Sequence, residues 1–129
     1  VKISEEEVRF LFGLEPEVGA EHICHTFPVK LVFVTCGADG CYFKNSRAAG
    51  REPALPGLRI ADTTGAGDIF GGSAVSRLLQ LGRAPEALTE DELTAIGRFA
   101  ATAASLSTQY PGGISAIVPE ETVLRCMEG

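Results

Sequence analysis

The sequence lacks tryptophan, contains one methionine and two histidines, and has only 11 lysine and arginine residues against 17 aspartate and glutamate residues. The formal net charge is therefore -6 at pH 7. A surface for nucleic acid or an anionic membrane needs clustered lysine and arginine, so the composition predicts neither partner. An anionic ligand would have to be held mainly by backbone dipoles.

Long apolar runs are also missing. No stretch approaches the roughly 20 apolar residues of a membrane-spanning helix, and the chain lacks the basic, apolar and small-residue progression of a secretory signal. These absences predict a cytoplasmic protein without a membrane partner. A chain of 129 residues, 45% hydrophobic and 22% charged, is typical of one globular domain with a real core.

The four cysteines occur without CxxC spacing, in or beside apolar stretches. They are Cys24, Cys36, Cys41 and Cys126. Buried free thiols are therefore predicted rather than a disulfide or a zinc site. The segment HICH, with His22 and His25, has no second pair of ligands, so we interpret both histidines as incidental helix residues.

Local capping signals place the first helices. Ser4 followed by Glu7 forms a capping box, which predicts a helix over residues 5–12. A weaker helical pattern covers residues 16–26. Because Val1 is not a methionine and the first residues already open a helix, we expect the chain to be a piece of a longer one.

The strand signals come next along the chain. Residues 29–35 form a nearly continuous apolar, β-branched run, which is typical of a strand buried on both faces of a sheet. The Asp-Gly pair at 39–40 predicts a hairpin that leads into a strand at 41–44. Residues 45–57 are rich in glycine, proline and polar residues and predict a connection, and residues 58–61 predict a short strand.

Three further helices follow. Helical spacing of apolar residues starts at Asp68, and Thr89 with Glu92 forms a second capping box. A final amphipathic helix starts after Pro119. This order of elements predicts an α/β fold, in which one half of a sheet carries helices on its faces.

The stretch DTTGAGDIFGGSAV, residues 62–75, joins a glycine-rich loop to a helix. Such junctions bind anions, because the first N–H groups of a helix have no intrahelical partner and the helix dipole is positive there. Asp68 puts a negative charge at this junction. It therefore either takes the place of the anion or acts on a group to which the anion is attached.

The segment DTTGAGD, with the small apolar helix behind it, resembles the signature of the PfkB-type carbohydrate kinases, the family that includes ribokinase and bacterial fructokinase. VFVTCGADG is similar to the family's strand and nucleotide loop, RFAATAASLSTQYPGG to its helix beside the adenine, and VPEETV to its closing helix. The resemblance implies a ribokinase-like three-layer sandwich, of which residues 1–129 are the C-terminal, nucleotide-binding portion. The N-terminal half, with most sugar contacts and the lid, would lie outside these residues.

The resemblance also implies an ATP-dependent sugar kinase, and the segments ISEEE and DTTGAGDIF favour a fructokinase-like one. Asp68 would accept the proton of the sugar hydroxyl that attacks the γ-phosphorus. The backbone N–H groups of Gly65, Ala66 and Gly67, with that of Asp68, would hold the transferred phosphoryl group. The alternative is that Asp68 only caps its helix.

The same resemblance places the nucleotide. Thr35, Gly37 and Gly40 would lie beside the ribose and phosphates of ATP, although hairpin geometry alone would also explain these residues. Ala101 and Ala104 lie on the helix expected beside the adenine. At Ala101 the family often has asparagine, so this departure predicts an apolar contact with adenine and weaker selectivity for ATP.

Two cation sites follow from the resemblance. Glu7 matches the acidic end of an N-x-x-E element linked to Mg2+ and phosphate, but Ser4 replaces the asparagine, and a capping box explains both residues. The backbone around Asp62 and Thr64, with Gly112, matches a site for a monovalent cation, K+. The sequence leaves open whether that site is kept, since a simple turn also accounts for these residues.

Two rival interpretations stay open. GAGDIFG has the G-x-G-x-x-x-G spacing of a dinucleotide-binding unit, but a carboxylate at position 68 would meet the pyrophosphate. The second rival is a non-catalytic, truncated kinase half that binds nucleotide or a protein partner. For the kinase, the expected partners are ATP and a small sugar, with a homodimer for the full-length protein. The residues that choose the sugar would lie mainly upstream.

Overall fold

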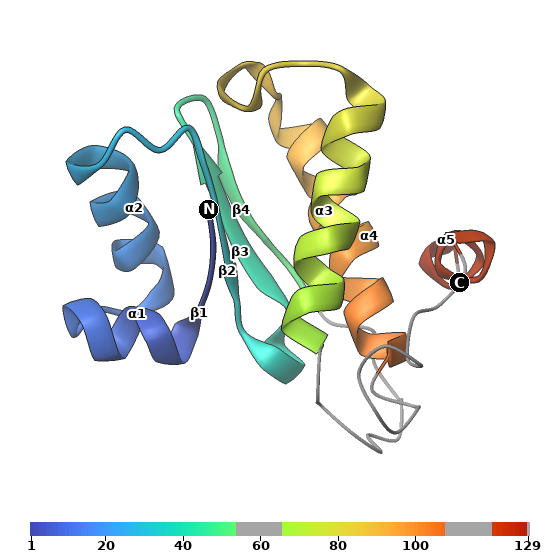
Figure 1. Ribbon diagram of the computed structural model, residues 1–129, viewed down its shortest axis with the longest axis horizontal. Coiled ribbons are helices and arrows are strands. Elements are labelled where there is room, and N and C mark those ends of the chain that lie inside the picture. Colours follow the sequence, from blue (N-terminus) through green and yellow to red (C-terminus); the bar gives the residue numbers. More distant parts are fainter. Residues whose placement is uncertain (54–65, 108–119, 129) are drawn as a thin grey trace.

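The computed structural model describes residues 1–53, 66–107 and 120–128 (Figure 1). The elements in chain order are β1 (Lys2–Ser4), α1 (Glu5–Phe12), α2 (Pro16–Thr26), β2 (Leu31–Thr35), the 3-10 turn η1 (Gly37–Asp39), β3 (Cys41–Asn45), β4 (Ala49–Glu52), α3 (Ala66–Leu81), the 3-10 turn η2 (Pro85–Ala87), α4 (Glu90–Ser107) and α5 (Glu120–Glu128). Within these ranges, none of the helices has the length and apolar content to cross a membrane.

The four strands form one mixed sheet in the order β1-β2-β3-β4. β1 is parallel to β2, whereas β3 is antiparallel to both of its neighbours. The register aligns Ser4, Thr35, Cys41 and Glu52 in one row across the sheet. Because β1 and β2 both end at this row, we call it the carboxyl edge of the sheet.

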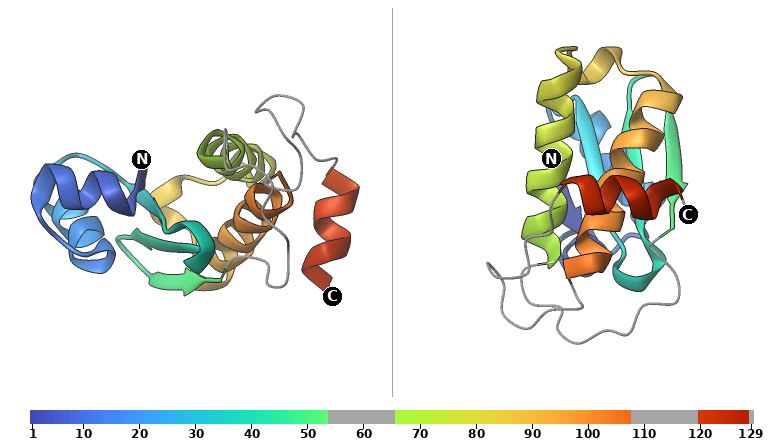
Figure 2. Two further views of the ribbon diagram at one scale, coloured as in Figure 1. Left: turned by 90° about the horizontal axis from the view of Figure 1, so that it is seen from below. Right: turned by 90° about the vertical axis from the view of Figure 1, so that its right-hand side faces the viewer.

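The molecule has three layers. α1 and α2 cover one face of the sheet, α3 and α4 cover the other, and α5 packs on the outer side of α4 (Figures 1 and 2). Successive side chains of a strand point to opposite faces, so β2 serves both cores. Leu31 and Phe33 enter the core beneath α3 and α4, and Val32 and Val34 enter the core beneath α1 and α2. The predicted doubly buried strand at 29–35 is thus confirmed, with its start at Leu31.

Both predicted capping boxes are present. The Glu7 N–H donates to Ser4 Oγ at 3.1 Å, and the Ser4 N–H donates to Glu7 Oε1 at 3.0 Å. The Glu92 N–H donates to Thr89 Oγ1 at 3.3 Å, and the Thr89 N–H donates to Glu92 Oε1 at 3.0 Å. The helices α1 and α4 begin directly after these caps, and α2, α3 and α5 confirm the other three predicted helices.

The sequence patterns miss two strands. Lys2–Ser4, expected to open a helix, forms β1, because three residues are too few to show an alternating pattern and pairing with residues 33–35 decides their conformation. Ala49–Glu52, expected in a connection, forms β4 by pairing with residues 41–44, and its sequence AGRE carries no apolar alternation. The strand predicted at 58–61 lies outside the described residues.

All four cysteines are free, as predicted. Cys36 and Cys41 are buried, and the other two are half-buried. Burial raises the pKa of the Cys41 thiol to about 12. The ring of His22 lies edge-on to Phe12 with centroids 4.9 Å apart, and the described part of the chain contains no group of three side chains suited to hold a metal.

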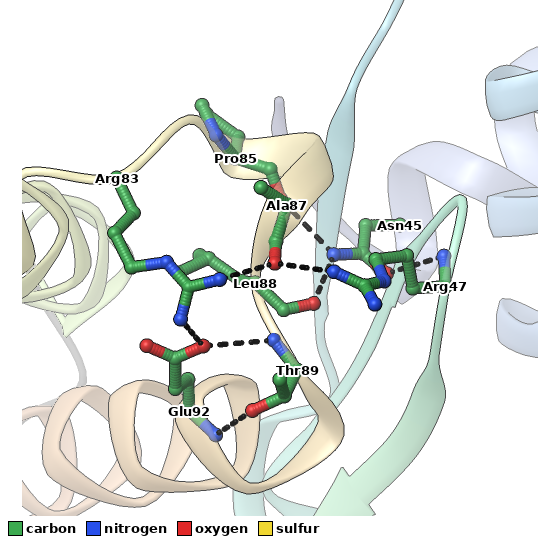
Figure 3. Close-up of polar contacts among 8 residues, drawn as sticks. All are labelled: Asn45, Arg47, Arg83, Pro85, Ala87, Leu88, Thr89 and Glu92. Atoms are coloured by element: carbon green, nitrogen blue, oxygen red, sulfur yellow. Dashed lines mark hydrogen bonds and ion pairs between the residues drawn. The ribbon is translucent and has the colours of Figure 1, made fainter.

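The end of the sheet opposite the carboxyl edge is held by a buried amide. Asn45 Oδ1 accepts the N–H groups of Arg47 at 2.9 Å and Ala48 at 2.8 Å. Its Nδ2 donates to the carbonyls of Pro85 at 3.0 Å and Leu88 at 2.9 Å (Figure 3). These bonds join the turn between β3 and β4 to the connection between α3 and α4.

An arginine on α3 holds the outermost helix. The Cζ atom of Arg77 lies 3.9 Å from the centroid of the Phe99 ring on α4, and its Nη2 lies 2.8 Å from Glu120 Oε1 at the start of α5. Val123 of α5 is buried in a cluster with Phe99. A cation over an aromatic face and a carboxylate beside it therefore connect three helices.

Candidate functional site

The described candidate residues gather around the carboxyl edge. Ser4 and Thr35 are neighbours in the register there, α1 starts directly after Ser4, and η1 follows β2. The first turn of α3 lies at the same end of the molecule (Figure 1). Ligands of open α/β sheets bind outside the carboxyl ends of parallel strands, so the fold places the predicted chemistry where a ligand is expected.

Asp68 lies in the first turn of α3, as the third residue of the helix, with an exposed side chain. An N-cap residue has non-helical backbone and precedes the helix, so this position differs from the simple cap that the sequence allowed. A carboxylate in the first turn is favoured by the helix dipole. Because it is exposed, the carboxylate can reach a bound molecule.

The predicted anion-binding backbone is described in part. Ala66, Gly67 and Asp68 form the start of α3, where N–H groups have no carbonyl four residues earlier in the helix to bond. Gly65 lies outside the described residues. The described portion therefore presents donors at a positive helix end, as an anion site requires.

The structure adds a residue that the sequence analysis missed. A Cβ atom placed on Gly67 would lie 3.2 Å from Lys2 Nζ, and one on Gly71 would lie 3.5 Å from Lys2 Cδ. The side chain of Lys2 therefore runs along α3 with its ammonium group at the start of the helix. No local pattern signals this, because β1 itself was not predicted and the contact joins distant parts of the chain.

Glu7 lies near the same edge and is exposed. The pKa of the Glu7 carboxyl is lower than its usual value, chiefly because the backbone N–H of Ser4 donates to it. The Ser4 hydroxyl lowers this pKa next, and the charge of Lys2 lowers it to a smaller extent. The capping role of Glu7 is thus confirmed. The Glu7 carboxylate has acceptor positions that the cap does not use. A role of Glu7 in binding Mg2+ therefore stays a prediction.

The predicted nucleotide loop is a tight turn. Gly37 and Gly40 have φ angles of 55° and 88°, a conformation that favours glycine. The Cys36 N–H donates to the Gly40 carbonyl at 2.8 Å, and the Gly40 N–H donates to the Gly37 carbonyl at 3.1 Å. Turn geometry therefore accounts for both glycines. The contact of this loop and of the half-buried Thr35 with a nucleotide stays a prediction.

The two alanines of α4 that were predicted to lie beside the adenine differ in access. Ala101 is 4% exposed and belongs to the core shared with Phe33 and Phe70, whereas Ala104 is only partly buried at the margin of that core. Ala104 is thus the more accessible of the two to an adenine ring, and the predicted contact of either residue with adenine is untested. Asp62, Thr64 and Gly112, predicted around a monovalent cation, lie outside the described residues.

A groove of about 450 Å³ runs along β1 and α3. Its walls include the apolar side chains of Phe33, Phe70 and Ala74, and Lys2 lies among its lining residues. Val75, also in the lining, is 54% exposed. The part of α3 that follows Asp68 in the chain therefore presents apolar surface next to Lys2.

The model of the pfkB family of carbohydrate kinases matches residues 1–121. A fructokinase of Solanum tuberosum is 29% identical over 133 aligned residues, which cover 100% of this chain and 40% of that protein. The chain thus spans well under half the length of this relative.

Two solved structures with ligands are also similar. Arabidopsis thaliana ribokinase, complexed with ribose and ATP, has a TM-score of 0.78 and 28% identity over 100% of this chain and 41% of its own. Vibrio cholerae fructokinase, bound to fructose, ADP and a calcium ion, has a TM-score of 0.79 and 28% identity over 98% of this chain and 40% of its own. The predicted ribokinase-like α/β fold is confirmed.

Proposed function

Because the chain belongs to the pfkB family of carbohydrate kinases, we propose that it forms the nucleotide-binding part of an enzyme that phosphorylates a sugar with ATP. The observation that carries this is the exposed Asp68 in the first turn of α3, beside Gly67, at the carboxyl edge of the sheet. Residues 1–129 would be the C-terminal portion of a single ribokinase-like domain. The N-terminal half would supply most sugar contacts and the lid.

In the proposed reaction, a sugar hydroxyl attacks the γ-phosphorus of ATP. The Asp68 carboxylate accepts the hydroxyl proton while the new oxygen–phosphorus bond forms and the bond to the β-phosphate oxygen breaks, releasing ADP. The N–H groups from Gly65 to Asp68 hold the oxygens of the transferred group. The low side-chain bulk of Gly67 supports this role, because it allows a phosphate to approach the backbone closely.

The other predicted residues would position the nucleotide. Thr35, Gly37 and Gly40 would line the path of the ribose and phosphates, and Ala104 with Ala101 would lie toward the adenine. Glu7 offers one exposed carboxylate, which fits Mg2+, since this ion is usually held by one or two carboxylates and the substrate phosphates. The ion would neutralise phosphate charge. The backbone around Asp62 and Thr64, together with Gly112, would hold a K+ ion.

Fructose is the sugar that we propose first. The similarity to the Solanum tuberosum fructokinase and to the fructose-bound Vibrio cholerae enzyme supports it. A ribokinase is similar to the same degree, so the substrate must be chosen by experiment. Membership of the kinase family argues against the dinucleotide-binding alternative.

Phosphorylation of a panel of sugars by the full-length protein tests the proposal. We expect ATP-dependent transfer, fastest with fructose, measured as ADP release and as the phosphorylated product. Transfer that is fastest to ribose would overturn only the fructose assignment. If the full-length protein binds ATP but phosphorylates no sugar, the proposed activity is wrong and the chain is a non-catalytic nucleotide-binding module.

A further inference from the structure

Glu52 ends β4 at the carboxyl edge, and its side chain lies on the side of the sheet that α4 covers. Side chains alternate along a strand, and the preceding residue, Arg51, is on the opposite face, where it pairs with Glu17 of α2. Gly50 shares the face of Glu52. A Cβ atom added to Gly50 would lie 2.8 Å from Phe43 Cζ, in the core beneath α3 and α4. The half-buried Glu52 carboxylate therefore faces α4.

Small residues of α4 lie close to Glu52. Glu52 is the register partner of Cys41, and a Cβ atom added to Gly97 would lie 3.3 Å from Cys41 Sγ. Ala101 follows Gly97 by one turn on the same side of the helix. The last turns of α4, with Ala104, lie at the same end of the molecule as η1 and the first turn of α3 (Figure 1). Glu52 thus lies beside the alanines that we propose to face adenine.

The Glu52 carboxylate lacks a partner among the described residues. None of the hydrogen bonds or ion pairs formed there involves it. Burial raises the pKa of this carboxyl above its usual value, and the charge of Arg98 on α4 opposes the rise to a smaller extent. The Arg98 guanidinium itself donates to the Met127 carbonyl of α5. A partly desolvated acceptor without a donor is unfavourable, and an N–H group of a ligand would satisfy it.

We propose that Glu52 accepts a hydrogen bond from the 6-amino group of adenine and thereby makes the site selective for ATP; this inference rests on the proposed function. Apolar contact with Ala101 and Ala104 would hold any purine ring, because it involves neither a donor nor an acceptor. At C6 adenine carries an amino donor, whereas guanine carries a carbonyl oxygen, which a carboxylate repels. The alanine at position 101 predicted weaker selectivity for ATP, and Glu52 would supply the missing polar contact from the sheet.

The test compares two nucleotides as phosphoryl donors for the full-length protein. Purine riboside triphosphate is ATP without the 6-amino group, so the ratio of kcat/KM for ATP to kcat/KM for this analogue measures the contact of that group. We expect the original protein to favour ATP by roughly tenfold or more, the size of a hydrogen bond to a charged acceptor. In Glu52→Ala this preference should vanish, through a loss with ATP alone.

Two further variants serve as comparisons. Glu52→Gln keeps an acceptor oxygen without the charge, so it should retain part of the preference for ATP. Glu90→Ala is the matched control, because Glu90 is an exposed carboxylate in the first turn of α4, at the end of that helix remote from Ala104. It should keep the full preference.

Other results overturn the inference. Equal use of ATP and the analogue by the original protein would show that Glu52 does not bind the 6-amino group, and would leave the proposed kinase activity standing. An equal loss with both nucleotides in Glu52→Ala would show that Glu52 acts on the fold. A preference for GTP that disappears in Glu52→Ala would show that the carboxylate binds guanine instead. If the full-length protein transfers phosphate from none of these nucleotides, the proposed function and the role of Glu52 both fail.

Discussion

The side-chain amide of Asn45 in β3 donates a 2.9 Å hydrogen bond to the carbonyl of Leu88, which follows α3 in the chain (Figure 3). Asn45 is only 1% exposed, and its Nδ2 also donates to the carbonyl of Pro85. The connection between α3 and α4 is thus tied to the sheet, just before the start of α4.

Replacing Asn45 should therefore destabilise the protein strongly. In Asn45→Ala the carbonyls of the buried Leu88 and the half-buried Pro85 lose their donor, and an unsatisfied buried group costs roughly 1–3 kcal/mol. Urea unfolding followed by circular dichroism measures the change. Ser46→Ala is the control, since Ser46 is exposed and donates to Glu86 at 3.3 Å. Similar midpoints for the two variants would mean that the buried amide adds no stability.

The sharpest test of the proposed mechanism is Asp68→Asn in the full-length protein. The amide cannot accept the hydroxyl proton, and general-base contributions are typically about 10²–10⁴-fold, so kcat should fall by that order. KM for ATP should stay within a few-fold, because size and position are preserved. Steady-state kinetics measures both.

Asp91→Asn is the matched control for that variant. Asp91 is exposed and lies in the first turn of α4, as Asp68 does in α3, so its replacement should leave kcat unchanged. If Asp68→Asn retained more than about a tenth of the rate, the base would be another group. A parallel loss of rate and thermal stability would instead indicate a structural role for Asp68.

Alanine at two glycines of α3 should have different effects, on helix stability at Gly72 and on ATP binding at Gly67. Gly72→Ala meets no neighbour within 4 Å, so it should stabilise the helix by about 0.5–1 kcal/mol. Gly67→Ala should fold, because the mobile end of Lys2 can yield, but its methyl group would displace the ammonium group and obstruct the backbone. We expect roughly tenfold weaker ATP binding, about 1.4 kcal/mol. Equal ATP affinity in the two variants would argue against phosphate at this turn.

Alkaline conditions should destabilise the protein through Cys41. Burial raises the pKa of this thiol from its ordinary value of 9.0 to about 12 in the folded state. The unfolded chain therefore releases the proton first, so stability is fully present below pH 9.0 and is lost as the pH rises toward 12. Urea midpoints between these pH values should fall more steeply for the original chain than for Cys41→Ala. Parallel slopes would show that this thiol titrates normally.

Residues 1–129 alone should show negligible sugar kinase activity. The chain spans 40% of the length of the Solanum tuberosum fructokinase, and positioning of both substrates with exclusion of water needs more of the fold. A coupled assay for ADP release with fructose and ATP measures this, with the full-length protein as the positive control. Sustained sugar-dependent turnover by the purified 129-residue chain would contradict the expectation.

Several features could be predicted from the sequence because neighbouring residues determine them. The capping boxes at Ser4 and Thr89 involve residues only three positions apart, so they mark the starts of α1 and α4 without knowledge of the fold. The apolar run of β2 signals a strand covered on both faces for the same reason. The motif around Asp68 is equally local, and the structure confirms that it opens a helix.

Only the tertiary structure decided the remaining parts of the sheet and site. β1 and β4 exist because backbone hydrogen bonds to β2 and β3 stabilise an extended conformation in segments whose own sequences carry no strand pattern. The placement of Lys2 follows from this pairing, since the position of β1 beside α3 brings its side chain to Gly67. A charge and a helix start that are far apart in the chain meet only when the layers pack, so no periodicity or spacing in the sequence could reveal their contact.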